Sequence, residues 1–324
     1  RCNWTLSLQL PKASFYHSST RKIPGEISVL DIGISRQFIE QATTDKYLFD
    51  YQSAFEIFKP RERHTHKGRY GHAFLFAGKR GSMGAAIMSG QACQRSGAGL
   101  LTVCVPGVGL NPLQTTLPEA MVIPDIHEEK LTEMPDLSRA NALGIGPGIG
   151  TDESTARLLK LLIQNAGLPM VMDADALNIL ADNPTWLAFL PPNTILTPHP
   201  GEFKRLIGAS SLDDDYLEKL SDFSRKNRVI TVLKDSVTTV ATPDAQLYFF
   251  DVGSAALASA GSGDVLTGVI LGLLTSGYSP SDAAKLGVYL HGEAGRIAGE
   301  LHGLESTLAR DVISCLGDAF HEFY

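Results

Sequence analysis

Short apolar runs alternate with longer segments of helical periodicity from Gly71 to the end of the chain. Repeated strand and helix units of this kind build a mostly parallel sheet covered by helices on both faces. The predicted strands are 73–77, 101–105, 140–145, 170–173, 194–196, 229–233, 237–241 and 246–250. The predicted helices are 84–96, 153–166, 201–207, 213–227, 263–275, 280–300 and 306–320. Because residues 242–245 form a turn between the last two strands, we expect a β-hairpin there.

The front of the chain does not follow this pattern. Residues 4–10 and 26–32 indicate two short strands joined by a polar stretch, and two strands alone are not a stable unit. A basic run at 59–64 precedes the alternating part and is typical of a solvated linker. We therefore predict two units, residues 1–50 and residues 51–324. The chain starts at Arg1 without a Met or a signal sequence, so we expect a cut or processed chain.

Composition excludes several classes of protein. With 324 residues, 44% apolar and 19% charged, the chain is neither disordered nor fibrous. The net charge of −7 gives no basic surface for nucleic acid, which favours a small-molecule partner. The four cysteines lack metal-binding spacing and are too few for a disulfide framework, so we expect reduced thiols and a cytoplasmic location. No apolar stretch reaches the roughly 18 residues of a membrane span.

Glycine-rich loops lie at three predicted junctions of strand and helix: 78–84, 146–150 and 261–264. Open α/β sheets bind ligands at the carboxyl ends of their strands, and glycine lets a phosphate approach backbone amides closely. None of the loops matches the P-loop or the dinucleotide-binding pattern. Together they predict a site for a nucleotide or a phosphorylated ligand.

Asp264 follows Gly261 and Gly263 at the predicted start of a helix. One interpretation is that Asp264 caps the helix, as Asp often does. The other is that Asp264 is a general base that takes a proton from a hydroxyl group, while the amides around Gly263 stabilise the phosphoryl group in transfer. The spacing alone leaves both open.

Polar side chains follow several other predicted strands. Asp173 and Asp175 end a buried strand and are suited either to bind a hydroxylated ligand or hydrated Mg²⁺, or to cap a helix. His199 is held between two prolines, with Glu202 in the helical turn that follows. His291 fits a buried, hydrogen-bonded helix residue better than a catalyst.

The segment 234–238 offers an ammonium group and hydroxyls to a nucleotide, with a solvated turn as the alternative. The residues concerned are Lys234, Asp235, Ser236, Val237 and Thr238.

Taken together, these motifs resemble the NAD(P)H-hydrate dehydratase family, a ribokinase-like three-layer sandwich that repairs hydrated nicotinamide cofactors. The resemblance extends from about Tyr51 to the end of the chain. The segments that carry it are 66–68, 97–100, 144–150, 173–178, 196–202, 233–234 and 261–268.

The resemblance implies an enzyme that dehydrates NADHX and NADPHX, the hydrated forms of NADH and NADPH, in their S form. ADP or ATP would phosphorylate the C6 hydroxyl, and phosphate would then be eliminated, with Mg²⁺ as cofactor. Asp264 would be the base, with Gly261 and Gly263 in the anion hole and Glu202 ordering Mg²⁺ through water. The nucleotide would contact the segment 234–238 and Gly263. The hydrated cofactor would contact Ala85, Gly148, Asp173, His199 and Asp264.

Residues 1 to about 35 resemble the last strands of the NAD(P)H-hydrate epimerase domain that many bacterial members carry upstream. We therefore expect the C-terminal part of a bifunctional enzyme, ADP-dependent and forming a homo-oligomer, tetrameric or larger. Two departures from the family concern the nucleotide site: Asp235 replaces a glycine, and Ser254 lies in a loop where Asn-x-Gly is usual. The alternatives are a ribokinase-like kinase of vitamin precursors, which His199 in place of Asn disfavours, and a non-catalytic nucleotide-binding regulatory protein.

Overall fold

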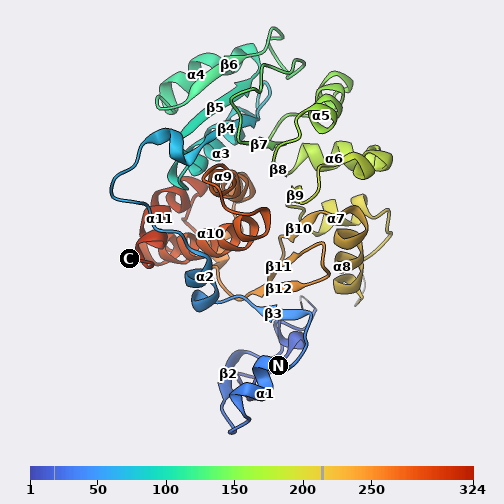
Figure 1. Ribbon diagram of the computed structural model, residues 1–324, viewed down its shortest axis with the longest axis vertical. Coiled ribbons are helices and arrows are strands. Elements are labelled where there is room, and N and C mark those ends of the chain that lie inside the picture. Colours follow the sequence, from blue (N-terminus) through green and yellow to red (C-terminus); the bar gives the residue numbers. More distant parts are fainter. Residues whose placement is uncertain (18, 213–214) are drawn as a thin grey trace.

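A ten-stranded sheet forms the centre of the molecule in the computed structural model, which describes residues 1–17, 19–212 and 215–324 (Figure 1). The strand order is β3-β12-β11-β10-β9-β8-β7-β4-β5-β6, parallel except where β11 pairs with β10 and β12. This confirms the predicted sheet and hairpin. The strands are β3 (Lys46–Leu48), β4 (His72–Phe76), β5 (Leu100–Val105), β6 (Met121–Pro124), β7 (Ala142–Ile145), β8 (Met170–Met172), β9 (Ile195–Leu196), β10 (Ile230–Leu233), β11 (Thr238–Ala241) and β12 (Leu247–Phe250).

Helices cover both faces of the sheet, which gives three layers. Figure 1 shows α3, α9, α10 and α11 on one face and α5 to α8 on the other. The helices are α1 (Arg36–Gln41), α2 (Tyr51–Ile57), α3 (Met83–Arg95), α4 (Leu110–Thr116), α5 (Glu153–Asn165), α6 (Asp175–Asp182), α7 (Pro200–Leu206), α8 (Tyr216–Asn227), α9 (Ser262–Thr275), α10 (Pro280–His302) and α11 (Ala309–His321). Short 3-10 helices occupy Ala13–Phe15, Lys67–Tyr70, Gly107–Gly109, Pro184–Phe189 and Ala255–Leu257.

The strand residues divide between two hydrophobic cores. In β4, Ala73 and Leu75 pack in the core beneath α3 and α9, whereas Phe74 and Phe76 pack in the core on the opposite face. Side chains alternate across a strand, so a strand with helices on both sides is apolar at every position. This is why continuous apolar runs, rather than alternating ones, mark the central strands in the sequence.

Sequence patterning places most of the strands and helices that it predicts within two residues of their observed ends, but it misses β3, β6, α1, α2, α4 and α6. The two strands lie at opposite edges of the sheet and expose much of their surface, so they lack a continuous apolar run. The predicted start of one helix at Asp213 lies outside the described residues; α8 begins at Tyr216.

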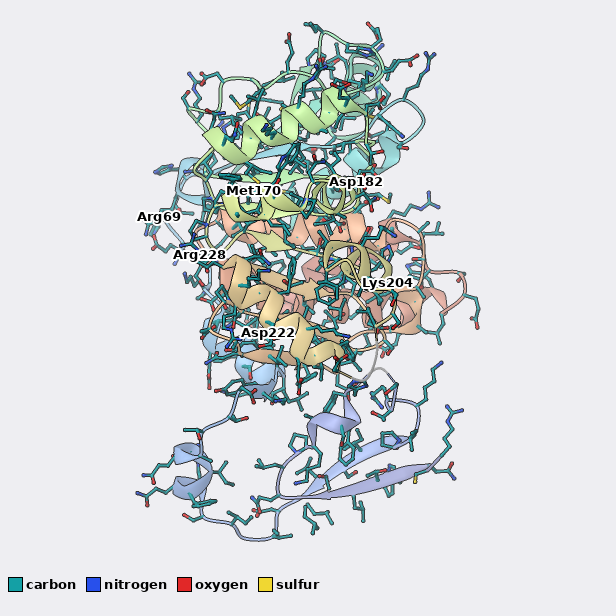
Figure 2. The ribbon with its side chains drawn as sticks, turned by 90° about the vertical axis from the view of Figure 1, so that its right-hand side faces the viewer. Arg69, Met170, Asp182, Lys204, Asp222 and Arg228 are labelled. Carbon is teal, nitrogen blue, oxygen red and sulfur yellow. The ribbon has the colours of Figure 1, made fainter. Side chains whose placement is uncertain are left out.

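The front of the chain forms a parallel pair, β1 (Trp4–Leu8) and β2 (Glu26–Leu30), in a small sheet of its own. It lies beyond the β3 edge of the large sheet (Figures 1 and 2). Strand β3, just before residue 50, pairs in parallel with β12 of the large sheet. Further contacts join the two parts, including the Arg21–Asp251 ion pair at 2.6 Å. A division at residue 50 stays a prediction.

The basic run at 59–64 has a structural use. Lys59 donates to the carbonyl of Gly277, just after α9, and Arg61 donates to the carbonyl of Gly97, just after α3. Cations at these helix ends satisfy carbonyl groups that have no partner within the helix. A cavity of about 460 Å³ lies beside them, and it contains none of the predicted site residues.

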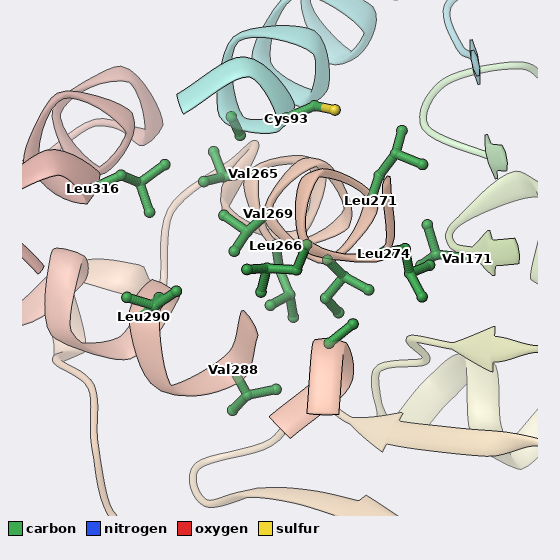
Figure 3. Close-up of a cluster of buried hydrophobic side chains, with 14 of the residues drawn as sticks. Cys93, Val171, Val265, Leu266, Val269, Leu271, Leu274, Val288, Leu290 and Leu316 are labelled. Atoms are coloured by element: carbon green, nitrogen blue, oxygen red, sulfur yellow. The ribbon is translucent and has the colours of Figure 1, made fainter. Parts of the chain in front are cut away.

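Helix α9 is buried on almost every side, between α3, α10 and the sheet (Figure 3). It approaches α3 closely through Gly268 and Gly272, where an added Cβ would meet the backbone carbonyls of Ser89 and Cys93.

Among the described residues, no helix combines the length and the apolar character that crossing a membrane requires.

We predict that Gly268→Ala lowers the free energy of unfolding by about 1–3 kcal/mol, because the new methyl group has to push α3 away from α9. Gly317→Ala is the control, because α11 has open space there and alanine favours a helix by up to about 1 kcal/mol. Urea denaturation of both variants measures the effect. Equal stability of the two variants would contradict the close contact.

Candidate active site

The predicted site residues converge on the edge of the sheet where the parallel strands end. The loops after β4 and β7 are joined by a hydrogen bond from the N–H of Gly78 to the carbonyl of Pro147, 2.8 Å long. The loops after β9 and β10 are joined by a hydrogen bond of 2.9 Å from the N–H of Lys234 to the carbonyl of Pro198. Helix α9 begins at the same edge, as expected for ligand sites of open α/β sheets.

The start of α9 provides free amide groups. Gly261, the residue before the helix, has a φ of 90°, and a Cβ there would lie 2.5 Å from Sδ of Met88. The backbone conformation therefore favours glycine, and a larger residue would also have to displace the end of the Met88 side chain. In the described part of the chain, the N–H groups of Gly263 and Asp264 have no hydrogen-bond acceptor. Such amides at a helix N-terminus attract anions.

Asp264 is poised to accept a proton. Its carboxylate makes no capping hydrogen bond to the helix among the described residues, which favours the catalytic interpretation over the capping one. Burial, together with the negative charges of Asp173 and Asp175, raises its pKa from 3.8 to about 6, although Lys234 acts in the opposite direction. A carboxylate with a pKa near neutrality is suited to general base catalysis.

Asp173 is fully engaged within the protein. Its Oδ1 lies 2.6 Å from Nζ of Lys234, and its Oδ2 accepts a hydrogen bond of 2.9 Å from Thr267. Asp175, two residues on, accepts from the N–H of Gly150 at 2.7 Å and so fixes the loop after β7. Between the two carboxylates, Ala174 has a φ of 48°, a strained conformation for alanine of the kind that often marks functional sites.

His199 and Glu202 form a capping box at the start of α7. The Nδ1 atom of His199 accepts from the N–H of Gly201, and Oε2 of Glu202 accepts from the N–H of His199 at 2.8 Å. Glu202 is buried, whereas the His199 side chain is half exposed at the site edge. The second carboxylate oxygen, Oε1, lies 3.5 Å from Nε2 of His199.

The donor set suits Mg²⁺ only through water and phosphate. No group of three His, Cys, Asp or Glu side chains in the described chain could hold a metal ion. Mg²⁺ typically keeps several waters and takes one or two carboxylates plus substrate phosphates. Glu202, with one oxygen already bonded to backbone, fits the role of a carboxylate that orders such a water.

Two predicted substrate contacts lie together. A Cβ on Gly148 would come within 3.1 Å of the Cβ of Ala85, so the loop after β7 rests directly on the first turn of α3. Because Gly148 has a φ of 64° and this close neighbour, a larger residue would be strained and crowded.

The predicted nucleotide segment forms the turn into β11. Asp235 and Ser236 are exposed, and the N–H of Ser236 donates to the Asp235 carboxylate at 2.7 Å. Val237 is buried in the core with 2% exposure, so only its backbone is available to a ligand. In the other departing loop, Ser254 accepts from the N–H of Ala256.

Two further residues support α9. His291 is buried, as predicted, with Nε2 3.1 Å from Oγ of Ser262, and burial and the charge of Lys234 lower its pKa to about 4. Thr267 contacts Asp173 from within α9. Sequence reasoning misses Thr267, because a threonine inside an apolar helix has no pattern that distinguishes it from a packing residue.

Comparisons with known proteins agree with this geometry. The family model of NAD(P)H-hydrate dehydratase matches residues 73–317. A bifunctional NAD(P)H-hydrate repair enzyme from Moorella thermoacetica is 35% identical over 326 residues, 98% of this chain and 62% of the relative. An ADP-dependent (S)-NAD(P)H-hydrate dehydratase from Neisseria meningitidis is 35% identical over 259 residues, 78% of this chain and 85% of the relative. This chain thus spans less than two thirds of the bifunctional relative.

Comparison with solved structures agrees with the comparison of sequences. An ADP/ATP-dependent NAD(P)H-hydrate dehydratase from Bacillus subtilis, co-crystallised with ATP and Mg²⁺, superposes with a TM-score of 0.73. The match has 28% identity and covers 86% of this chain and 99% of the other. A ribokinase from Cryptococcus neoformans in complex with ADP, 14% identical, has a TM-score of 0.51 and covers 76% of this chain and 99% of the other. At that identity the likeness concerns the fold alone, which is the predicted ribokinase-like one.

We predict that Asp264 makes the protein less stable as pH rises from about 4 to about 6. In that range the folded protein holds a proton on Asp264 that the unfolded chain, with a pKa near 3.8, has lost. Asp264→Asn should therefore raise the free energy of unfolding by about 2–3 kcal/mol at pH 8 and by little at pH 4. Denaturation at several pH values measures this, with Asp282→Asn, in the first turn of α10, as control. Parallel pH profiles for wild type and Asp264→Asn would contradict the burial of this charge.

Proposed function

The chain belongs to the NAD(P)H-hydrate dehydratase family, and from this premise we propose that it restores NADH and NADPH from their hydrated S forms with ADP as phosphoryl donor. The observation that carries the proposal is the position of Asp264. This carboxylate, whose pKa is raised to about 6, lies in the first turn of a helix in which the N–H groups of Gly263 and Asp264 have no acceptor among the described residues. A base and an anion site are thus within one turn of each other.

The proposed reaction requires both the base and the anion site. Hydrated NADH carries a hydroxyl group at C6 of the nicotinamide ring, and hydroxide is a poor leaving group. Asp264 removes the hydroxyl proton as the oxygen attacks the terminal phosphorus of ADP, which forms the O–P bond and releases AMP. The ring nitrogen then supplies the electron pair that expels phosphate from C6, and loss of a proton from C5 of the resulting iminium ion forms the C5–C6 double bond and restores NADH.

The residues around Asp264 have separate tasks. The amides of Gly263 and Asp264 donate hydrogen bonds to the oxygens of the transferred phosphoryl group, where negative charge is concentrated. Ala85, Gly148 and His199 would position the hydrated ring. The segment 234–238 contacts the nucleotide, with Val237 contributing only backbone atoms.

Mg²⁺, when bound, neutralises charge on the nucleotide phosphates. Glu202 would hold it through a water molecule with the oxygen that lies near His199. Asp235 adds a negative charge at the nucleotide segment, so we expect the donor with fewer phosphates, ADP, to be preferred over ATP.

Three further expectations belong with this proposal. We propose that residues 1–50 are related to the epimerase half of bifunctional relatives, supported by exposed apolar side chains along β1 such as Trp4 and Leu6. We also propose a homo-oligomer, tetrameric or larger, in the cytoplasm. Light scattering on purified protein tests the assembly, and cell fractionation tests the location.

We predict that incubation with hydrated NADH, ADP and Mg²⁺ restores the near-ultraviolet absorbance of NADH. Asp264→Asn should lower the rate by about 10²–10⁴, because the general base is lost while the fold is kept. Asp282→Asn, the same change in the first turn of α10, should leave the rate unchanged.

No recovery of absorbance with either ADP or ATP would contradict the proposed function. Accumulation of a stable phosphorylated product would instead indicate a ribokinase-like kinase, and nucleotide binding without turnover would indicate a regulatory protein. An undiminished rate in Asp264→Asn would remove Asp264 from its role as base.

A further inference from the structure

We propose that Thr267 and Asp173 are positioning residues that hold the ammonium group of Lys234 over the first turn of α9, where it contacts the phosphoryl group in transfer. The inference rests on the proposed function, because it assigns a task to three residues of the same site. It changes the expected role of Asp173 from a contact of the hydrated cofactor to a support for Lys234.

The three residues come from different elements. Asp173 follows β8 and Lys234 follows β10, so their ion pair spans the end of β9, the strand between them. Thr267 reaches Asp173 from the second turn of α9. The contacts therefore tie the helix to two strands at the edge where the site lies.

Gly263 shows how close the ammonium group lies to the helix start. A Cβ built on Gly263 would be 3.2 Å from Nζ of Lys234 and 3.6 Å from Oδ2 of Asp173. The ion pair thus occupies the space that a side chain at this position would need. An anion bound to the amides of Gly263 and Asp264 would meet the ammonium group as well.

Because the Asp173 side chain is buried, its carboxylate needs hydrogen-bonding partners within the protein. The Asp173 side chain has 2% exposure, and a buried carboxylate is costly unless both of its oxygens have partners. Lys234 satisfies one oxygen and Thr267 the other. The hydroxyl of Thr267 also lies 3.1 Å from the carbonyl of Gly263, but the charged carboxylate is the nearer and stronger acceptor for its single proton.

The arrangement has a consequence for catalysis. An ammonium group has three donors, and Asp173 takes one of them. The others remain able to face the phosphoryl oxygens. A cation fixed in place before the reaction stabilises developing charge without the cost of reorganisation. If Thr267 lost its hydroxyl, Asp173 could rotate and carry the ammonium group away from the helix.

We predict that Thr267→Val, which keeps the shape and removes the hydroxyl, lowers kcat by about 10–100-fold, the range typical of residues that orient a functional group. The dissociation constant for AMP should change less than about threefold, because binding is not the step affected. Thr267→Ser should recover most of the rate.

Thr275→Val is the matched control. Thr275 is also buried in α9, and its hydroxyl donates to the carbonyl of Leu271, but it lies at the other end of the helix. Its replacement should leave kcat unchanged. A full rate in Thr267→Val, or a rate in Thr267→Ser as low as that in Thr267→Val, would overturn the proposal.

A second measurement is independent of turnover. Trace acetylation of lysines, quantified by mass spectrometry, should be several-fold faster at Lys234 in Thr267→Val than in wild type or Thr275→Val, because the ion pair is loosened. Unchanged labelling would overturn the positioning role even if the enzyme is active. Faster labelling in a protein whose wild type shows no turnover would uphold the positioning and contradict the proposed function.

Discussion

The burial of helix α9 is the constraint on which the rest of the structure depends. Of its fourteen residues, only Gly263 and Asp264 are not buried. The residues of a helix enclosed in this way have to be apolar, and they have to be small where another helix crosses. The glycines that face α3 are such small residues. Its axis is fixed between α3, α10 and the sheet (Figure 3). These two partly buried residues therefore lie at the carboxyl edge of the sheet in a defined orientation.

At that edge of the sheet, burial and neighbouring carboxylates raise the pKa of Asp264. This suits Asp264 to act as a base but lowers the free energy of unfolding. Asp173 and Asp264 place two carboxylates at one helix start, and the ammonium group of Lys234 pairs with the first of them. The pair with Lys234 satisfies Asp173, whereas Asp264 keeps a raised pKa and an affinity for protons near neutral pH. Amides such as those of Gly263 and Asp264 at a helix N-terminus favour an anion locally, although the protein carries a net charge of −7.

The fold could be predicted from the sequence because its central strands are apolar at every position, and a candidate site could be named because glycines and acids follow those strands. What could not be predicted depends on three-dimensional pairing. Asp173 and Lys234 are 61 residues apart in sequence, and no local pattern says that they meet. Thr267 resembles a packing residue until Asp173 is placed beside it. The edge strand β3 carries too few apolar residues to be recognised.

The most direct test of the account is to quantify NADH, AMP and inorganic phosphate in a single reaction of the wild-type protein with hydrated NADH, ADP and Mg²⁺. Phosphorylation of the C6 hydroxyl with Asp264 as the base, followed by elimination, predicts that all three appear together and in equal amounts. Release of AMP and phosphate without NADH would show that the protein only hydrolyses the nucleotide. AMP matched by a phosphorylated cofactor that does not eliminate phosphate would show a kinase, and either result would contradict the account.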